Sequence, residues 1–83
     1  MTLEALQQAE QRTVGVKQTE KAVARGTAQI VFVGCDADER VTEKLLELCR
    51  EHHVEIVTGE NMADIGRACG IHVKAAAAAI LKS

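Results

Sequence analysis

The sequence predicts an α/β protein, a three-layer α/β/α sandwich in which strands alternate with helices. The stretch AQIVFVG at 28–34 is a near-continuous β-branched run, and VEIV at 54–57 is a second, shorter one. Such runs are typical of strands that are buried on both faces. Around them, apolar residues recur at the spacing of amphipathic helices. Because a chain of 83 residues can build only one small core, we expect a single domain, 1–83.

The first part of the chain predicts two helices. A short helix is expected at the start, from an apolar stripe of Leu3, Leu6 and Ala9. A small strand at 13–16 follows. From Lys17 the spacing becomes helical again, with Gly26 as the C′ residue. Three residues of this helix are expected to face the core: Thr19, Ala22 and Val23.

The second part of the chain continues the alternation. After strand 28–34, Asp38 or a neighbour is expected to cap a helix at 39–52. The apolar stripe of that helix consists of Val41, Leu45, Leu48, Cys49 and His52. Strand 54–57 precedes a further helix, which Asn61 and Asp64 open as a capping box and Gly70 closes. The tail KAAAAAILKS is ambiguous because alanine favours helix, yet the preceding IHV and the closed helix favour a strand.

Composition disfavours several classes of function. The only aromatic residue is Phe32, whereas single-stranded nucleic acid is usually bound by stacking on several aromatic side chains. No apolar run approaches the roughly 20 residues that cross a bilayer, and the start of the chain lacks a basic and apolar signal pattern. Cys35, Cys49 and Cys69 form no Cys-x-x-Cys motif, which favours reduced thiols. We therefore expect a cytoplasmic protein without a membrane partner.

Charge is unevenly distributed along the chain. Residues 1–35 carry four bases and three acids, residues 36–60 three bases and eight acids, and residues 61–83 three bases and one acid. A polyanion would avoid the acidic middle third, whose side chains we expect to face away from it. It could approach the two ends of the chain if they meet in space.

The second predicted helix carries a cationic stripe. Lys17, Lys21 and Arg25 recur at i, i+4 and i+8, with Gln18 beside them and the side-chain-free Gly15 just before. A helix N-terminus binds phosphate through its free N–H groups. Lysine can donate to guanine O6 or N7, and glutamine can both donate and accept. This pattern indicates a nucleic-acid contact, although a solvated polar helix face would carry the same stripe.

Two segments resemble a known family. GVKQTEKAVARG is similar to the Gly-x-Asn-Glu-x-x-Lys-Ala-x-x-Arg-Gly segment of the kink-turn-binding ribosomal-protein family, of the L-seven-Ae and L-thirty-e type. ENMADIGRACGIHVKAAAAAI resembles the family's later Ser-Lys-x-x-Leu-Gly-x-Ala-x-Gly stretch and the residues after it. The resemblance runs from about Gly15 to the last residues. The short bacterial YbxF-like paralogues match the chain particularly well.

The resemblance implies a four-stranded mixed sheet and an RNA partner. Members of the family bind the kink-turn, a duplex bent at a three-nucleotide bulge that is followed by tandem sheared G·A pairs. Such a motif occurs in ribosomal RNA and in riboswitch-type leaders. Since recognition needs no chemistry, we expect a monomeric, ribosome-associated binder that is not an enzyme, with no cofactor and no DNA partner.

The resemblance also implies roles for residues at two places. Gly15 would allow close approach, Lys17 and Gln18 would face guanine edges, Lys21 would reach a base edge and Arg25 a phosphate. In the later segment, a hydrophobic loop of Ile71, His72 and Val73 would pack against the bulge nucleotides. Two cations, Lys74 and Arg67, would add positive charge nearby. Lys17 and Gln18 replace the family's Asn-Glu, and a neutral amide accepts hydrogen bonds more weakly than a carboxylate. Affinity and base preference are therefore expected to differ.

Three other interpretations remain open. Two Cys-x-x-His pairs, of Cys49 with His52 and Cys69 with His72, have side chains suited to Zn²⁺, although the spacing matches no usual zinc pattern. Cys35 followed by Asp36 after a strand has the place of an enzyme nucleophile. A protein–protein adaptor would bind RNA weakly and without salt dependence.

Overall fold

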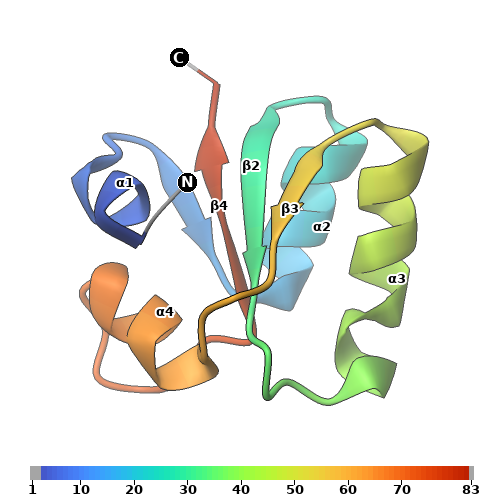
Figure 1. Ribbon diagram of the computed structural model, residues 1–83. Coiled ribbons are helices and arrows are strands. Elements are labelled where there is room, and N and C mark those ends of the chain that lie inside the picture. Colours follow the sequence, from blue (N-terminus) through green and yellow to red (C-terminus); the bar gives the residue numbers. More distant parts are fainter. Residues whose placement is uncertain (1–2, 83) are drawn as a thin grey trace.

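Helices and strands alternate along residues 3–82, the part of the chain that the computed structural model describes (Figure 1). The elements are α1 (Leu3–Gln8), β1 (Arg12–Val14), α2 (Val16–Ala24), β2 (Ala28–Val33), α3 (Glu39–Glu51), β3 (Glu55–Val57), α4 (Met62–Ala68) and β4 (Ala77–Leu81). The predicted α/β class is confirmed.

The strands form one mixed sheet in the order β1-β4-β2-β3. Strand β4 is antiparallel to both of its neighbours, with Ala79 opposite Thr13 on one side and Val31 on the other. Strand β2 is parallel to β3, where Val31 pairs with Ile56. The last strand of the chain therefore lies inside the sheet and joins β1 to the β2–β3 pair.

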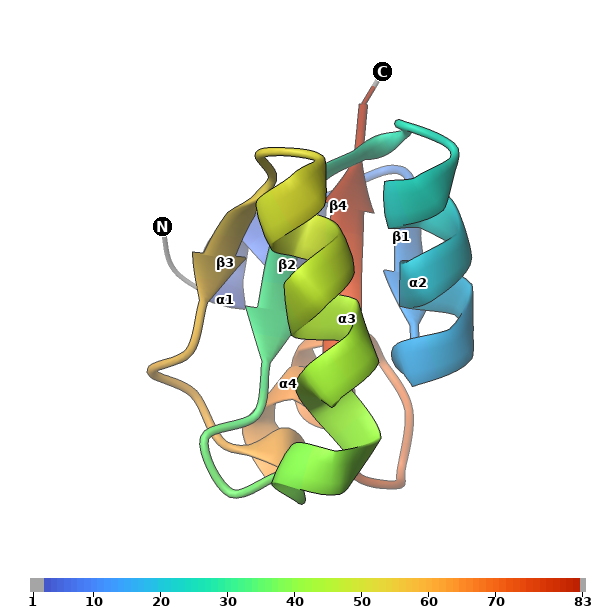
Figure 2. The ribbon, with the colours of Figure 1, turned by 90° about the vertical axis from the view of Figure 1, so that its right-hand side faces the viewer.

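Two helices cover each face of the sheet, as Figures 1 and 2 show. Helices α2 and α3 pack together on one face, and their buried residues meet Val31 and Val33 of β2. Helices α1 and α4 lie on the other face, where Phe32 is fully buried between them and the sheet. The three-layer α/β/α arrangement is thus confirmed, with one half of the core on each side.

The alanine run forms strand β4 rather than a helix. Ala77, Ala78 and Ala79 are all completely buried, and they point alternately to the two halves of the core. Tertiary packing overrides the helical propensity of alanine here, because a small side chain lets both helix layers approach the middle of the sheet.

Three sequence predictions are wrong in detail. Strand 54–57 is not covered on both faces: β3 is an edge strand with a neighbour on one side only, and Glu55 is exposed while Ile56 and Val57 are partly buried. On α3 the buried stripe is Thr42, Leu45 and Cys49, whereas Val41 is half exposed and His52 is an exposed C-cap residue. The first small strand ends at Val14, because Gly15 already caps the helix that begins at Val16.

Helix α1 is too short to be stable alone, and Arg12 fixes it to the rest of the domain. The Arg12 guanidinium donates hydrogen bonds of 3.2–3.4 Å to the carbonyl oxygens of Leu6, Gln7 and Ala9. A further bond of 3.2 Å reaches the carbonyl oxygen of Cys69, just after α4. One side chain thereby supplies donors to the C-terminal carbonyls of both helices on this face.

Candidate nucleic-acid interface

The junction of β1 with α2 and the loop between α4 and β4 meet at one end of the sheet, at the bottom of Figure 1. The backbone N–H of Gly15 donates to the carbonyl oxygen of Ala77 at 2.8 Å, and that of Gly34 to Ala76 at 2.9 Å. Figure 1 shows the loop running from the end of α4 along the bottom of the molecule to the start of β4. The β1–α2 junction is therefore hydrogen-bonded to the first residue of β4, three residues after Lys74 in the chain.

Gly15 gives α2 an open N-terminus. Its φ of 97° and ψ of 157° belong to a region that is essentially restricted to glycine, and no side chain caps the helix. A β-carbon at this position would have no atom within 4 Å, so space is free in front of the backbone. The first helical hydrogen bond runs from the Thr19 N–H to the Gly15 carbonyl oxygen at 3.1 Å, so the N–H groups of residues 16–18 are available to an anion.

The polar stripe of α2 is exposed from its first turn to its end. Lys17, Gln18, Lys21 and Arg25 are all exposed. Of residues 3–82, only the pairs Arg40–Asp38 and Arg67–Asp64 form ion pairs, so the three cations of the stripe carry no ionic partner within these residues. Arg25 follows the last turn of α2, about 12 Å along the helix axis from Lys17. It therefore lies away from the end where the two segments meet.

Two contacts orient the start of α2. The side-chain oxygen of Gln18 accepts a hydrogen bond from the Val14 N–H at 3.4 Å, which holds the amide over the β1–α2 junction and leaves its NH₂ group to donate. Beneath it, the hydroxyl oxygens of Thr13 and Thr19 lie 2.8 Å apart in a buried hydrogen bond. This bond ties the helix to the strand and limits rotation of the cationic stripe.

The loop after α4 presents apolar and basic side chains together. Ile71 packs partly against the core, whereas Val73 has 69% of its surface exposed. His72 and Lys74 are exposed, and Arg67 joins these four residues around one hollow on the surface. Arg67 is bound to Asp64 at 3.3 Å and lies on the face of the sheet opposite α2. The structure thus brings all five residues together beside α4, at the same end of the sheet as the start of the α2 stripe.

Gly66 shapes this loop, and sequence reasoning missed it. A β-carbon at Gly66 would overlap the carbonyl oxygen of Val73 and lie 3.2 Å from the Val73 carbonyl carbon. The loop can cross α4 this closely only because Gly66 has no side chain. Hydrogen bonds of 3.1 Å hold it there, from the Ile71 N–H to the Gly66 oxygen and from the Ala75 N–H to the Met62 oxygen. A glycine inside a helical pattern was the available signal.

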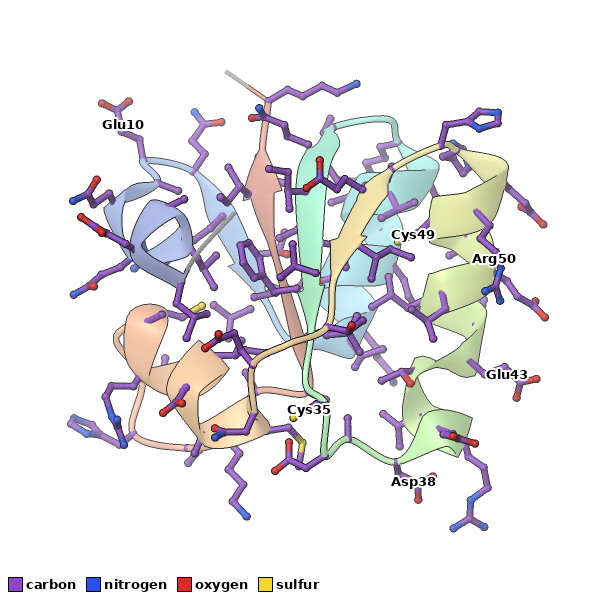
Figure 3. The ribbon with its side chains drawn as sticks, in the orientation of Figure 1. Glu10, Cys35, Asp38, Glu43, Cys49 and Arg50 are labelled. Carbon is purple, nitrogen blue, oxygen red and sulfur yellow. The ribbon has the colours of Figure 1, made fainter. Side chains whose placement is uncertain are left out.

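The acidic residues are less segregated than predicted. Glu43 projects from the outer side of α3, as expected, and Glu10 lies at the end of the molecule away from the start of α2 (Figure 3). Asp38, however, lies at the N-terminus of α3, at the end of the sheet that also holds the start of α2. It is paired with Arg40 at 3.2 Å, and hydrogen bonds from the Arg40 side chain and backbone lower the pKa of its carboxyl group.

The geometry argues against a joint zinc site. Cys49 packs between α3 and the sheet, whereas Cys69 is buried on the other face with α4. Burial raises the pKa of both thiols, which favours the neutral form. No group of three or more metal-binding side chains occurs among residues 3–82. The two Cys-x-x-His pairs are therefore separated by the sheet and cannot share one ion.

Asp36 has a structural role rather than an evident catalytic one. Its carboxylate accepts a hydrogen bond from the Met62 N–H at 2.9 Å and so joins the β2–α3 loop to the start of α4. Cys35, beside it, is exposed at this end of the molecule (Figure 3).

Within the described range, no helix has the length and apolar character that crossing a bilayer requires.

An open helix terminus with a cationic stripe lies at the same end of this α/β/α sandwich as an apolar loop with basic side chains, an arrangement typical of small nucleic-acid-binding domains. The sequence profile of the ribosomal protein L7Ae/L30e/S12e/Gadd45 family matches residues 1–83, and the chain belongs to this family. The RNA-binding protein YbxF of Geobacillus stearothermophilus is 39% identical over 82 residues, which cover 99% of this chain and all of the relative. The RNA-binding protein TTE2299 of Caldanaerobacter subterraneus is 46% identical over 68 residues, 82% of this chain and 83% of its own.

Longer proteins share the same core. The large ribosomal subunit protein eL8 of Halobacterium salinarum is 41% identical over 68 residues, which span 81% of this chain but 57% of eL8. The solved structure of the Giardia lamblia 15.5kD RNA binding protein superposes with a TM-score of 0.87 at 29% identity, covering 98% of this chain and 71% of that one. The sandwich is thus a fold on which RNA-binding and ribosomal proteins are built.

Proposed function

We propose that this protein is an RNA-binding protein that recognises kink-turns and stabilises their bent form. The observation that carries the proposal is the open α2 terminus with its exposed cationic stripe, which the 2.8 Å bond between Gly15 and Ala77 fixes to the start of β4, at the same end of the sheet as the apolar loop. The family relationship and the RNA-binding relatives support it. No catalytic step is part of the proposed role.

The two halves of the interface suit the two parts of a kink-turn. In the proposed complex Lys17, Gln18 and Lys21 meet the guanine edges of the sheared G·A pairs, while the N–H groups at the start of α2 and Arg25 hold phosphates. Ile71, His72 and Val73 pack against the bulge nucleotides, and Lys74 and Arg67 add positive charge beside them. Gln18 presents a donor, because its oxygen is engaged by the Val14 N–H at 3.4 Å. It is therefore suited to acceptor atoms of a base edge.

Stabilising a bent RNA requires no more energy than these contacts supply. A kink-turn exchanges between extended and bent forms, and a protein that binds only the bent form shifts the population toward it. A change from 1:99 to 99:1 needs about 5.5 kcal/mol of differential affinity. Two or three base-edge contacts at about 1–3 kcal/mol each, with phosphate neutralisation, reach this value.

The test is a titration against a fluorescently end-labelled kink-turn duplex and the same duplex with Watson–Crick pairs in place of the G·A pairs. We expect binding and bending of the kink-turn alone. Lys21→Ala should weaken that binding by about 1–3 kcal/mol, whereas Lys82→Ala should leave it nearly unchanged. Lys82 is a matched control because it is an exposed lysine beyond the far end of β4. Equal binding of both duplexes would mean that the surface is a generic cationic face without kink-turn specificity. Binding of neither duplex would favour the alternative function of a protein–protein adaptor.

A further inference from the structure

The cationic stripe of α2 also forms one wall of a shallow groove of about 480 Å³ between α2 and α3. Lys17 and Lys21 line it from α2, and Lys44 lines it from α3. Ala24 and Leu48 contribute apolar surface, and Glu20 contributes the one carboxylate of the lining. Lys44 was not a candidate on sequence grounds, because it belongs to the acidic middle third of the chain.

The groove has an excess of positive charge. Its three lysines are exposed, and none of them takes part in the two ion pairs formed within residues 3–82. Glu43, the neighbour of Lys44 in sequence, projects from the outer side of α3 (Figure 3). The packing of α2 against α3 therefore places the Lys44 ammonium group beside the two lysines of the stripe, on a separate helix.

We propose that Lys44 is a further RNA contact and that this groove holds the phosphate backbone of one stem of the bent RNA. This inference rests on the proposed function. Lys17 and Lys21 reach base edges from one wall, so the strand that leaves those bases passes the opposite wall, where a phosphate would meet Lys44. A single flexible ammonium suits a phosphate better than a base edge. The contact would position the stem without reading its sequence.

The experiment compares Lys44→Ala with Arg50→Ala in titrations of the kink-turn duplex from 50 to 200 mM salt. Both variants remove one cation from α3, but Arg50 projects from the outer side of the helix (Figure 3). Alanine favours helix, so both proteins are expected to fold. Losing one phosphate contact makes the slope of log K against log salt shallower by about 0.9. Raising the salt from 50 to 200 mM should therefore weaken RNA binding by Lys44→Ala about three- to fourfold less than it weakens binding by the wild-type protein.

Two further measurements sharpen the test. Glu20→Gln should tighten binding with the opposite change in slope, a gain that a damaged fold cannot produce. Shortening one of the two stems should abolish the Lys44 effect and leave the preference for sheared G·A pairs intact. If Lys44→Ala and Arg50→Ala behave alike while the wild-type protein still prefers the kink-turn, the groove is not an RNA surface. That result would overturn the inference about Lys44 and leave the proposed function standing. If the wild-type protein shows no preference, the proposed function fails first.

Discussion

Gly66→Ala should separate folding from RNA recognition. The added methyl group would overlap the Val73 carbonyl oxygen and would lie 3.2 Å from the Val73 carbonyl carbon and 3.4 Å from the Ala75 nitrogen. Ordinary van der Waals separation requires the loop to move by about 1 Å, because α4 cannot retreat into the core behind it. The substitution therefore displaces the exposed Val73 from its place beside α4.

The cost to stability is expected to be small. Inserting a methyl group into a packed contact costs about 1–3 kcal/mol, and replacing glycine by alanine inside a helix returns about 1 kcal/mol. We expect the free energy of unfolding to fall by about 0–2 kcal/mol, measured by urea denaturation. Binding of the kink-turn duplex should weaken at least tenfold, which corresponds to about 1.4 kcal/mol, because the apolar loop no longer meets the bulge.

Gly59→Ala is the matched control. A β-carbon at Gly59 would meet no atom within 4 Å, so this variant should bind RNA like the wild-type protein. Wild-type affinity in Gly66→Ala, or a protein more stable than wild type, would refute the reasoning. The first result would mean that the loop position is irrelevant to recognition, and the second that the contact yields without strain.

Four further experiments test other parts of the structure. Arg12→Ala should lower the free energy of unfolding by about 2 kcal/mol in urea denaturation, because it removes the donors to the ends of α1 and α4, and Arg12→Lys should not restore it. Thr13→Val and Thr19→Val should each cost about 1–3 kcal/mol, but the double variant should cost less than their sum, since neither hydroxyl is then left unpaired. In the native protein a thiol reagent should modify the exposed Cys35 quickly and Cys49 and Cys69 slowly, whereas all three should react quickly in urea. Because burial raises the pKa of Cys49 and Cys69, the unfolded state loses these protons first, and stability should decline above about pH 9, a thiol's ordinary pKa.

Periodicity predicted most of the elements, because each amphipathic pattern reports which side of its own helix or strand is buried. It placed the buried Thr19, Ala22 and Val23 of α2 correctly. On α3 it included Val41 in the buried stripe, although the polar Thr42 faces the core instead. The Thr42 hydroxyl donates a 3.5 Å hydrogen bond to the Asp38 carbonyl oxygen. A hydropathy pattern cannot recognise a buried threonine that satisfies its own hydroxyl.

The remaining features depend on how distant segments meet. Helical spacing pointed to the cationic stripe and the resemblance to the apolar loop, but the role of Gly66 depends on the path of residues 71–75 across α4. The place of Lys44 depends on which helix packs beside α2. Neither relation is encoded in local spacing, because each pairs residues that are more than five positions apart in the chain.

The position of β4 has a consequence for synthesis of the chain. Strands β1 and β2 do not pair with each other, and only residues 77–81 bridge them. While the ribosome is still adding those residues, the nascent protein exposes an unpaired edge on β2 and an isolated β1, two edges prone to association with other chains. The sheet therefore closes in a single late step. A truncation at residue 76 should abolish the native fold altogether rather than remove one strand from it.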